Sequence, residues 1–190
     1  MHAYRVPILA LAAICTMKGQ DNFNPFNYYY HNPPIYRAHQ VLAKRTQLHP
    51  AEAFAIIKHE SNFRAHASYR RHWLYDIFVK PKSSAYGYAQ AIDASWHEYQ
   101  KVNPSAKRSH YLDSIGFIHW YIHKHRSLFR NHSMTEHYKL YHDGPKNYQE
   151  QNLLVSEQVV RRVEQTYQQY KKEFDNRITS LDWRVEWHEF

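Results

Sequence analysis

Apolar residues recur at three- and four-residue steps in several segments of the chain, and this pattern predicts a mainly helical protein. No segment alternates convincingly enough to suggest a sheet, and no internal repeat occurs. A capping-box pattern at Ser133 is expected to open one helix, and Gly144 with Pro145 to end it. The helices predicted in this way cover residues 35–48, 50–61, 113–126, 133 to about 142 and 152–174, with a short helix beginning near Asp93.

The N-terminal stretch falls outside this helical pattern. Arg5 is followed by a short apolar run that ends at Cys15, too short to span a bilayer but typical of the core of an export signal. The run also resembles a lipoprotein cleavage site with Cys15 as the lipidated residue, although Ile14 stands where a small residue is expected. A buried N-terminal segment is the alternative. Residues 18–34, rich in Asn, Tyr and Pro, are predicted to be a linker.

The C-terminal stretch is also different in pattern. Trp183, Val185 and Trp187 alternate along it, as on a strand or an extended peptide. Such a tail would either pack across the domain or dock on a partner. We therefore expect an export signal and linker over residues 1–34, one helical domain over 35–174 and an extension over 175–190.

Composition narrows the function classes. The 190 residues hold 25 Lys and Arg against 17 Asp and Glu, so the chain is basic, with a formal charge of +8. A basic surface suits a polyanion, such as nucleic acid, anionic lipid or a cell wall that carries peptide carboxylates. Only four Gly occur, and no glycine-rich phosphate loop is present. The single cysteine excludes an internal disulfide and a zinc site of the CxxC type.

One candidate acid stands at the end of an apolar helical face. In the predicted helix 50–61, Glu60 continues the stripe of Ile56 and Ile57. Removing a carboxylate from water favours its neutral form, so Glu60 is expected to have a raised pKa and to donate a proton near neutral pH. A Glu at a frayed helix end, pointing into solvent, is the alternative from this pattern alone.

Three short segments, the first of which contains Glu60, together resemble the motifs of a known family. They read Ile-Ile-Lys-His-Glu-Ser-Asn-Phe from Ile56, Ala-Tyr-Gly-Tyr-Ala-Gln from Ala85, and Tyr-Lys-Leu-Tyr-His-Asp-Gly-Pro from Tyr138. In this order on a helical domain they resemble the lytic transglycosylase SLT domains, relatives of goose-type lysozyme. The resemblance covers roughly residues 35–170 and implies a lysozyme-like, all-helical fold.

The resemblance also implies roles for particular residues. Glu60 matches the catalytic acid, and Tyr141 matches the tyrosine that supports its carboxyl group. The remaining matched positions are those expected to neighbour the acid or line the sugar groove: Ser61, Gly87, Tyr88, Gln90, His142 and Gly144.

This sequence departs from the family motifs at two places. Tyr88 and Ala89 stand where the family has Leu and Met, and His142 and Asp143 stand where it has Asn and Ala. The second change bears on which side chain positions the substrate's N-acetyl group. The link between Glu60 and the second motif is also long, which implies an insertion around residues 70–82.

The implied activity is cleavage of the β-1,4 bond between N-acetylmuramic acid and N-acetylglucosamine in peptidoglycan, giving 1,6-anhydro ends without a cofactor or metal. It implies a periplasmic protein, which Cys15 would anchor to the outer membrane if lipidated. Small SLT domains often accompany envelope-spanning secretion or conjugation machines. The alternative is a non-catalytic structural or wall-binding subunit of such a machine. Nucleic-acid binding would require a strongly salt-dependent affinity, and no recognisable motif supports it.

Other residues offer competing chemistry. Asp93 and Asp143 are the nearest motif carboxylates and would support hydrolysis. The alternative is that Asp93 caps a helix and Asp143 forms a turn. His119 and His123 lie one helical turn apart and would suit zinc, although a core or solvated pair is the simpler interpretation. The aromatic side chains in the segment 64–83 would either stack on sugar rings or cover the core.

Overall fold

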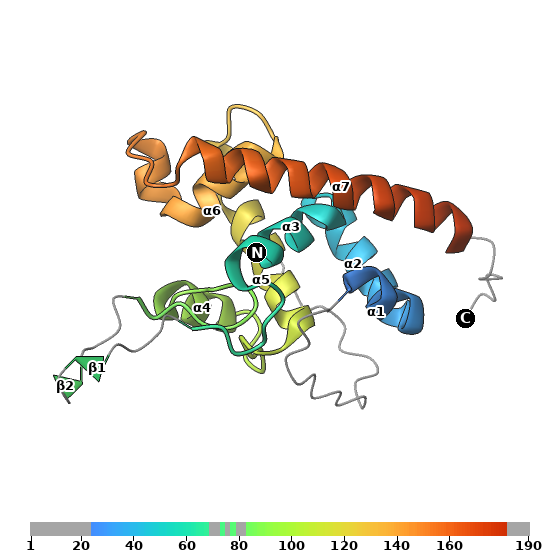
Figure 1. The fold of residues 1–190 in the computed structure, drawn as a ribbon, viewed down its shortest axis with the longest axis horizontal. Coiled ribbons are helices and arrows are strands. Elements are labelled where there is room, and N and C mark those ends of the chain that lie inside the picture. The colour runs from blue at the N-terminus through green and yellow to red at the C-terminus, as the bar shows by residue number, and fades with distance from the viewer. Residues whose placement is uncertain (1–23, 69–72, 75–76, 79–82, 182–190) are drawn as a thin grey trace.

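The computed structural model describes residues 24–68, 73–74, 77–78 and 83–181 (Figure 1). The predicted export signal, Cys15 and the tryptophans of the C-terminal tail lie outside these residues. The prediction of a mainly helical fold is confirmed. The helices are α1 (Pro25–His31), α2 (Pro33–Thr46), α3 (Pro50–Ser61), α4 (Asp93–Gln100), α5 (Tyr111–Lys124), α6 (Met134–Gln149) and α7 (Glu157–Leu181), with a 3-10 turn η1 (Arg126–Leu128) after α5.

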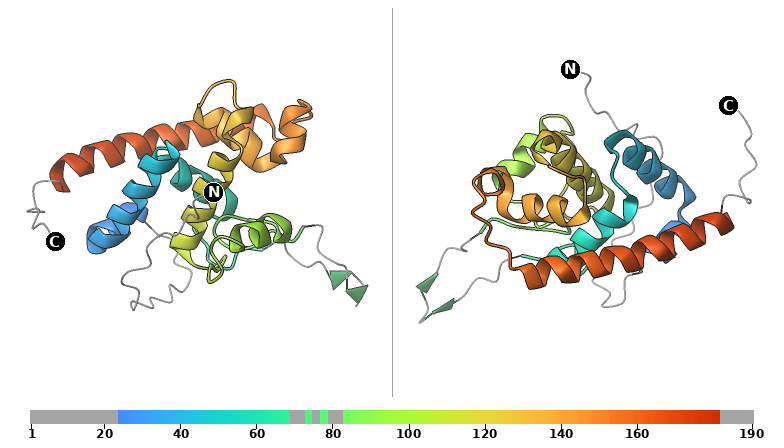
Figure 2. Two further views of the ribbon diagram at one scale, coloured as in Figure 1. Left: turned by 180° about the vertical axis from the view of Figure 1, so that it is seen from behind. Right: turned by 90° about the horizontal axis from the view of Figure 1, so that it is seen from above.

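Helix α3 is the centre of the core. Its residues Phe54, Ile56 and Ile57 are fully buried, and burial of such a side chain contributes about 1.5–3 kcal/mol each. The long helix α7 packs along α3, as both views of Figure 2 show. Helices α2 and α5 also contact α3. Pro50 at the first position and Glu52, which accepts from the backbone N–H of His49, fix where α3 begins.

The prediction of a linker before residue 35 is wrong for the described part. Residues 25–31 form α1, which starts because the Asn24 side chain accepts hydrogen bonds from the backbone of Phe26 and Asn27. The Phe26 ring meets Phe54 of α3 edge-on at 5.6 Å, and Tyr29 is almost fully buried. Phe26 and Tyr29 of this stretch therefore belong to the core of the domain, whereas Tyr30 is exposed.

One helix end agrees with the prediction and one differs. The helical backbone that opens after Ser133 is interrupted at Gly144, with φ 79° and ψ 163°, as predicted, and a second helical stretch under the same label α6 follows from Pro145 to Gln149. Helix α7 begins at Glu157 rather than near 152 and runs to Leu181. The first part of the expected C-terminal extension is therefore the end of a helix whose buried face includes Val160, Val163 and Phe174.

The described part of residues 64–83 contains a short hairpin. Strand β1 (Trp73–Leu74) pairs antiparallel with β2 (Ile77–Phe78), Trp73 opposite Phe78. Isolated bridges also join Tyr86 to Ser68 and to Ala91. These pairings were not expected, but they are too short to change the fold class. Among the described residues, no helix is both long enough and apolar enough to cross a membrane.

A polar chain crosses the core between α1, α2 and α5. The Tyr29 hydroxyl contacts Nδ1 of His39, whose Nε2 lies 2.8 Å from Nε2 of His119, and Nδ1 of His119 lies 2.8 Å from the Thr46 hydroxyl. Thr46 donates to the carbonyl of Leu42, so it accepts from His119. One set of neutral tautomers then satisfies every link. His119 is consequently a core residue and not half of an exposed zinc-binding pair.

Candidate active site

Glu60 lies in the last turn of α3, where the apolar stripe ends. Ser61 is the final helical residue, and Asn62 and Phe63 then turn the chain with φ of 50° and 57°. This left-handed turn ends the helix beside the carboxyl group and leaves Glu60 half-buried. The Glu60 side chain is therefore held at the edge of the core, as its position in the stripe predicted.

Helix α6 supplies the hydrogen bond to this carboxyl group. The hydroxyl of Tyr138 donates to Oε1 of Glu60 over 3.2 Å. The resemblance assigned this support to Tyr141, and here the structure corrects it, because the Tyr141 hydroxyl donates to the carbonyl oxygen of Ala89 over 2.6 Å. Both residues face the site from the same side of α6, since they are three positions apart.

The electrostatics of Glu60 suit a proton donor. Burial raises the pKa of its carboxyl group above the ordinary value, and this effect outweighs two others that lower it: the electrostatic influence of the nearby His142 and the Tyr138 hydrogen bond. Burial and the nearby Glu60 also raise the pKa of Tyr138, so its hydroxyl stays protonated and remains a donor. The site can thus hold Glu60 as an acid and still stabilise the carboxylate once the proton has left.

The second motif forms a tight turn facing α6. Gly87 has φ 80°, and its N–H donates to the carbonyl of Ala67 over 2.8 Å. A Cβ at Gly87 would lie 2.1 Å from the carbonyl oxygen of Arg108, so only glycine fits. The side-chain amide of Gln90 donates to the carbonyls of Ala67 and Gly87, at 2.9 and 2.8 Å. Gln90 therefore braces the turn from within.

Arg108 closes the turn from the outside. Its guanidinium group donates to the carbonyls of Ser84 and Ala91, each at 3.0 Å, and pairs with Asp93 at 2.7 Å. Asp93 was expected to cap α4, but Ile92 is the N-cap residue and Asp93 is the first helical one. Sequence reasoning missed Arg108, because its role depends on the tertiary approach of two loops.

Not all of the motif residues are accessible to a substrate. Ser61 is buried, with its hydroxyl donating to the carbonyl of Ile57, and Tyr88 is buried against Tyr111. We therefore assign both residues to support of the site and not to substrate contact. The matched residues that retain partial exposure are Glu60, Gln90, Tyr141, His142 and Gly144.

In the third motif, the side chain of Asp143 is buried and that of His142 is exposed. The side chain of Asp143 is only 1% exposed; it accepts from Nδ1 of His142 at 2.7 Å and from the backbone N–H groups of Leu154 and Val155. Asp143 therefore ties α6 to the start of the segment leading into α7, and it has no access to the water that hydrolysis would require. His142 remains exposed at 39% and lies close enough to influence Glu60.

Metal chemistry has little support among the candidate residues. His119 is engaged with His39 and Thr46, and His123 faces a separate pocket described below. Within the described ranges, no group of three or more His, Cys, Asp or Glu side chains is arranged to hold a metal ion.

Comparison with known families agrees with this geometry. The family model described as Transglycosylase SLT domain matches residues 3–177. Curated proteins and solved structures give no match to this chain. The family match spans α1 through most of α7 and includes Glu60, the Gly87 turn and Tyr138. The chain therefore belongs to the transglycosylase SLT domain family, whose members are generally lytic transglycosylases acting on peptidoglycan.

Proposed function

We propose that this protein is a peptidoglycan lytic transglycosylase in which Glu60 acts first as acid and then as base. The observation that carries the proposal is the pairing of a half-buried Glu60 of raised pKa with the Tyr138 hydroxyl, on the helix whose Tyr141 bonds to Ala89 of the second motif. A purely wall-binding subunit has no need for such an arrangement.

The first step is cleavage of the bond between N-acetylmuramic acid and N-acetylglucosamine. Protonated Glu60 gives its proton to the bridging oxygen, and the bond from that oxygen to the anomeric carbon of muramic acid breaks. The substrate's N-acetyl oxygen stabilises the positive charge at that carbon, as in substrate-assisted glycosidases. No second carboxylate is then required, which fits the burial of Asp143 and the ion pair of Asp93.

The second step closes the anhydro ring. The Glu60 carboxylate, stabilised by the Tyr138 hydroxyl, takes the proton from the 6-hydroxyl of muramic acid, and that oxygen bonds to the anomeric carbon. Glu60 is protonated again at the end, so one residue completes the cycle and no water is consumed. In this proposal the exposed His142 contacts the substrate, and it partly offsets the effect of burial because it lowers the pKa of Glu60.

This activity places the protein in the cell envelope. We propose that it acts in the periplasm, where peptidoglycan lies, and that it opens the wall locally for an envelope-spanning secretion or conjugation complex. The basic charge of the chain favours approach to a wall carrying peptide carboxylates. Whether Cys15 carries a lipid can be read directly from the mass of the mature protein.

Product analysis tests the reaction. Purified peptidoglycan is digested with the full chain in water enriched in oxygen-18, and the fragments are identified by mass spectrometry. We expect 1,6-anhydro ends without incorporated oxygen-18. Reducing ends labelled with oxygen-18 would mean hydrolysis and would overturn the transglycosylase step. Retention of the protein on the wall without any products would favour the structural-subunit alternative.

A further inference from the structure

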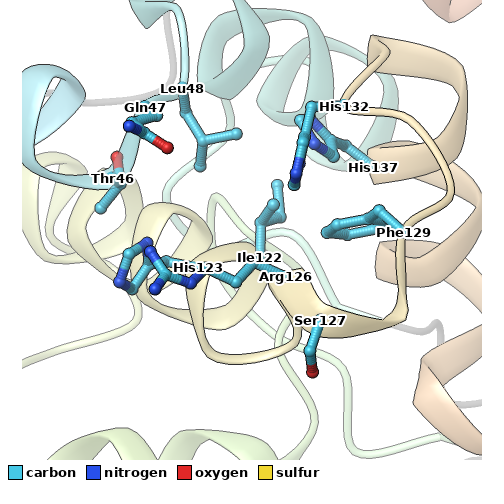
Figure 3. A pocket seen from close by; sticks show the side chains of 10 residues that line it. All are labelled: Thr46, Gln47, Leu48, Ile122, His123, Arg126, Ser127, Phe129, His132 and His137. Carbon is cyan, nitrogen blue, oxygen red and sulfur yellow. The ribbon is translucent and has the colours of Figure 1, made fainter.

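A second polar pocket lies away from Glu60, where the end of α2, the end of α5 and the start of α6 meet (Figure 3). Its volume is about 460 Å³, within the range of small-molecule sites. It shares no lining residue with the candidate active site. The residues around it are Thr46, Gln47, Leu48, Ile122, His123, Arg126, Ser127, Phe129, His132 and His137.

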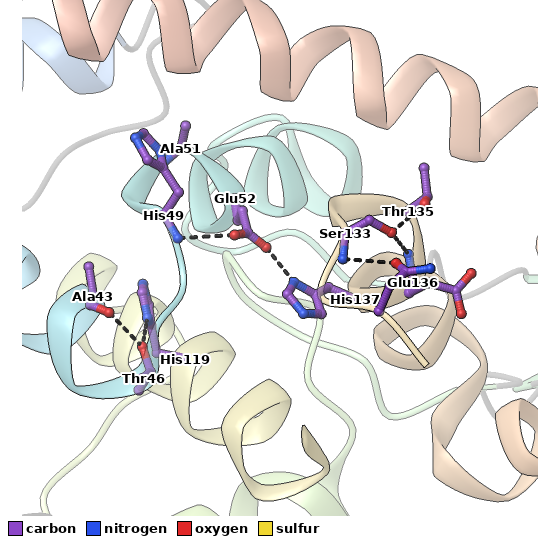
Figure 4. Close-up of polar contacts among 11 residues, drawn as sticks. Ala43, Thr46, His49, Ala51, Glu52, His119, Ser133, Thr135, Glu136 and His137 are labelled. Carbon is purple, nitrogen blue, oxygen red and sulfur yellow. Dashed lines mark hydrogen bonds and ion pairs between the residues drawn. The ribbon is translucent and has the colours of Figure 1, made fainter. Parts of the chain in front are cut away.

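One histidine of the lining is buried and has a ring nitrogen without a hydrogen-bond partner in the protein. His137 is only 1% exposed, and its Nδ1 lies 2.6 Å from Oε2 of Glu52 (Figure 4). The other oxygen of Glu52 accepts from the backbone N–H of His49 at 3.0 Å, so Nδ1 of His137 is the donor to a satisfied carboxylate. Nε2 of His137 is buried and has no hydrogen-bond partner in the protein. A buried polar atom of this kind costs stability unless a ligand or water pairs with it.

The rest of the lining is cationic, neutral polar or apolar. Arg126, His123 and His132 contribute positive or protonatable groups, and no acidic residue lines the pocket. Glu52 stands behind His137 and keeps that ring in place. Leu48, Ile122 and Phe129 provide an apolar part, with the Phe129 ring 4.7 Å from the His137 ring. Such a lining selects a negative headgroup and leaves space for a short apolar body.

We propose that this pocket binds a small anion, the carboxylate or phosphate group of a low-molecular-weight ligand, within the lining that Arg126, His132 and His137 share. When His137 is protonated, both ring nitrogens donate: Nδ1 to Glu52 and Nε2 to the anion. His132 stands at the opening, its ring 5.8 Å from that of His137. The proposal does not depend on the chemistry assigned to Glu60.

Binding is measured on the full chain by NMR of ring-labelled histidine at pH 6. The probes are inorganic phosphate, acetate and benzoate, titrated at constant ionic strength with chloride as the balancing anion. We expect saturable shifts of the His137 and His132 signals. Phosphate binding tighter than acetate identifies a phosphate ligand, and the reverse identifies a carboxylate. Benzoate should bind more tightly than acetate if the apolar lining contributes.

Two matched variants make the result specific to the pocket. Arg126→Gln should weaken the tightest probe by about tenfold, because a charged hydrogen bond to the anion is lost. Arg130→Gln, at an exposed arginine outside the lining, should leave the affinity unchanged. Removal of His137 risks unfolding, so it is not required for the test. No saturable shift with any probe, or equal affinity in Arg126→Gln, would overturn the proposal.

Discussion

The hydroxyl of Tyr138 and the carboxyl group of Glu60 are joined by a hydrogen bond of 3.2 Å between the middle of α6 and the end of α3. The bond favours the carboxylate, whereas burial favours the acid, and burial prevails. The two opposing effects keep one carboxyl group able both to release and to accept a proton, which the proposed reaction requires.

Removal of the Tyr138 hydroxyl should therefore slow the reaction and change its pH dependence. In Tyr138→Phe the Glu60 carboxylate loses a donor, so the pKa of Glu60 rises further. We expect about tenfold lower turnover of peptidoglycan, as for loss of one hydrogen bond to a charged group. The basic limb of the pH–rate profile should move to higher pH, because the Glu60 carboxyl group with the raised pKa keeps its proton to higher pH. A pH–rate profile that coincides with that of the unmodified protein would remove Tyr138 from the site.

Tyr141→Phe is the matched comparison on the same face of α6. Its hydroxyl is bonded to the carbonyl of Ala89, not to Glu60, so its loss should loosen the turn that follows Gly87. We expect a milder loss of activity, expressed mainly in substrate affinity, with the pH profile little changed. A larger shift of the pH profile than in Tyr138→Phe would reverse the roles assigned to the two tyrosines.

The Gly87 turn can be tested by stability. Gly87→Ala combines a positive φ with a contact at 2.1 Å to the Arg108 carbonyl, whereas Gly144→Ala meets only the positive φ, its nearest neighbour being 4.0 Å away. Backbone strain alone costs about 1–3 kcal/mol. Urea unfolding should thus show a measurable loss for Gly144→Ala and a larger one for Gly87→Ala. The opposite order would contradict the described packing of Arg108 over the turn.

The buried chain through His39 and His119 predicts loss of stability in acid; Figure 4 shows the end of this chain, where His119 meets Thr46. Burial lowers the pKa of His39 well below its ordinary value and that of His119 to about 3. Below about pH 6.5 the unfolded chain binds protons at these positions and the folded chain does not. The free energy of unfolding should consequently decrease as the pH is lowered below this value, by up to about 1.4 kcal/mol per pH unit for each histidine.

Unfolding by urea at a series of pH values between 7.5 and 4.5 measures this dependence. His119→Gln should reduce the slope, because one of the two groups no longer titrates. His97→Gln, at an exposed position of α4, should keep it. A slope that is unchanged by His119→Gln would show that the acid sensitivity arises elsewhere.

Parts of this site were predictable from the sequence, and parts were not. The position of Glu60 at the edge of the core was predictable, because this carboxylate continues the stripe of Ile56 and Ile57, although the stripe alone also allowed a solvent-exposed side chain. Tyr138 was missed, although it stands one helical turn before Tyr141 and so shares its face of α6. Which of two neighbouring tyrosines reaches Glu60 depends on the angle at which α6 crosses α3, and sequence spacing does not give that angle.

The fold shows the same division. The bounds of α3 were predicted without error, because Pro50 and the apolar run define the helix locally. Helix α1 was overlooked because its Asn, Tyr and Pro content resembles a linker, although Asn24 followed by Pro25 is a recognised helix start. The pairing of His39 with His119 joins residues 80 positions apart and requires the tertiary structure.

The most direct test of the central claim is the turnover of purified peptidoglycan by Glu60→Gln beside the unmodified protein. The substitution keeps the shape of the side chain and its acceptor for Tyr138, but removes the transferable proton. We predict a fall of about 100- to 10,000-fold in the release of anhydro-muropeptides, with an unfolding midpoint at pH 7 no lower than that of the unmodified protein. Undiminished turnover by a folded Glu60→Gln would contradict the assignment of Glu60 as the acid and base.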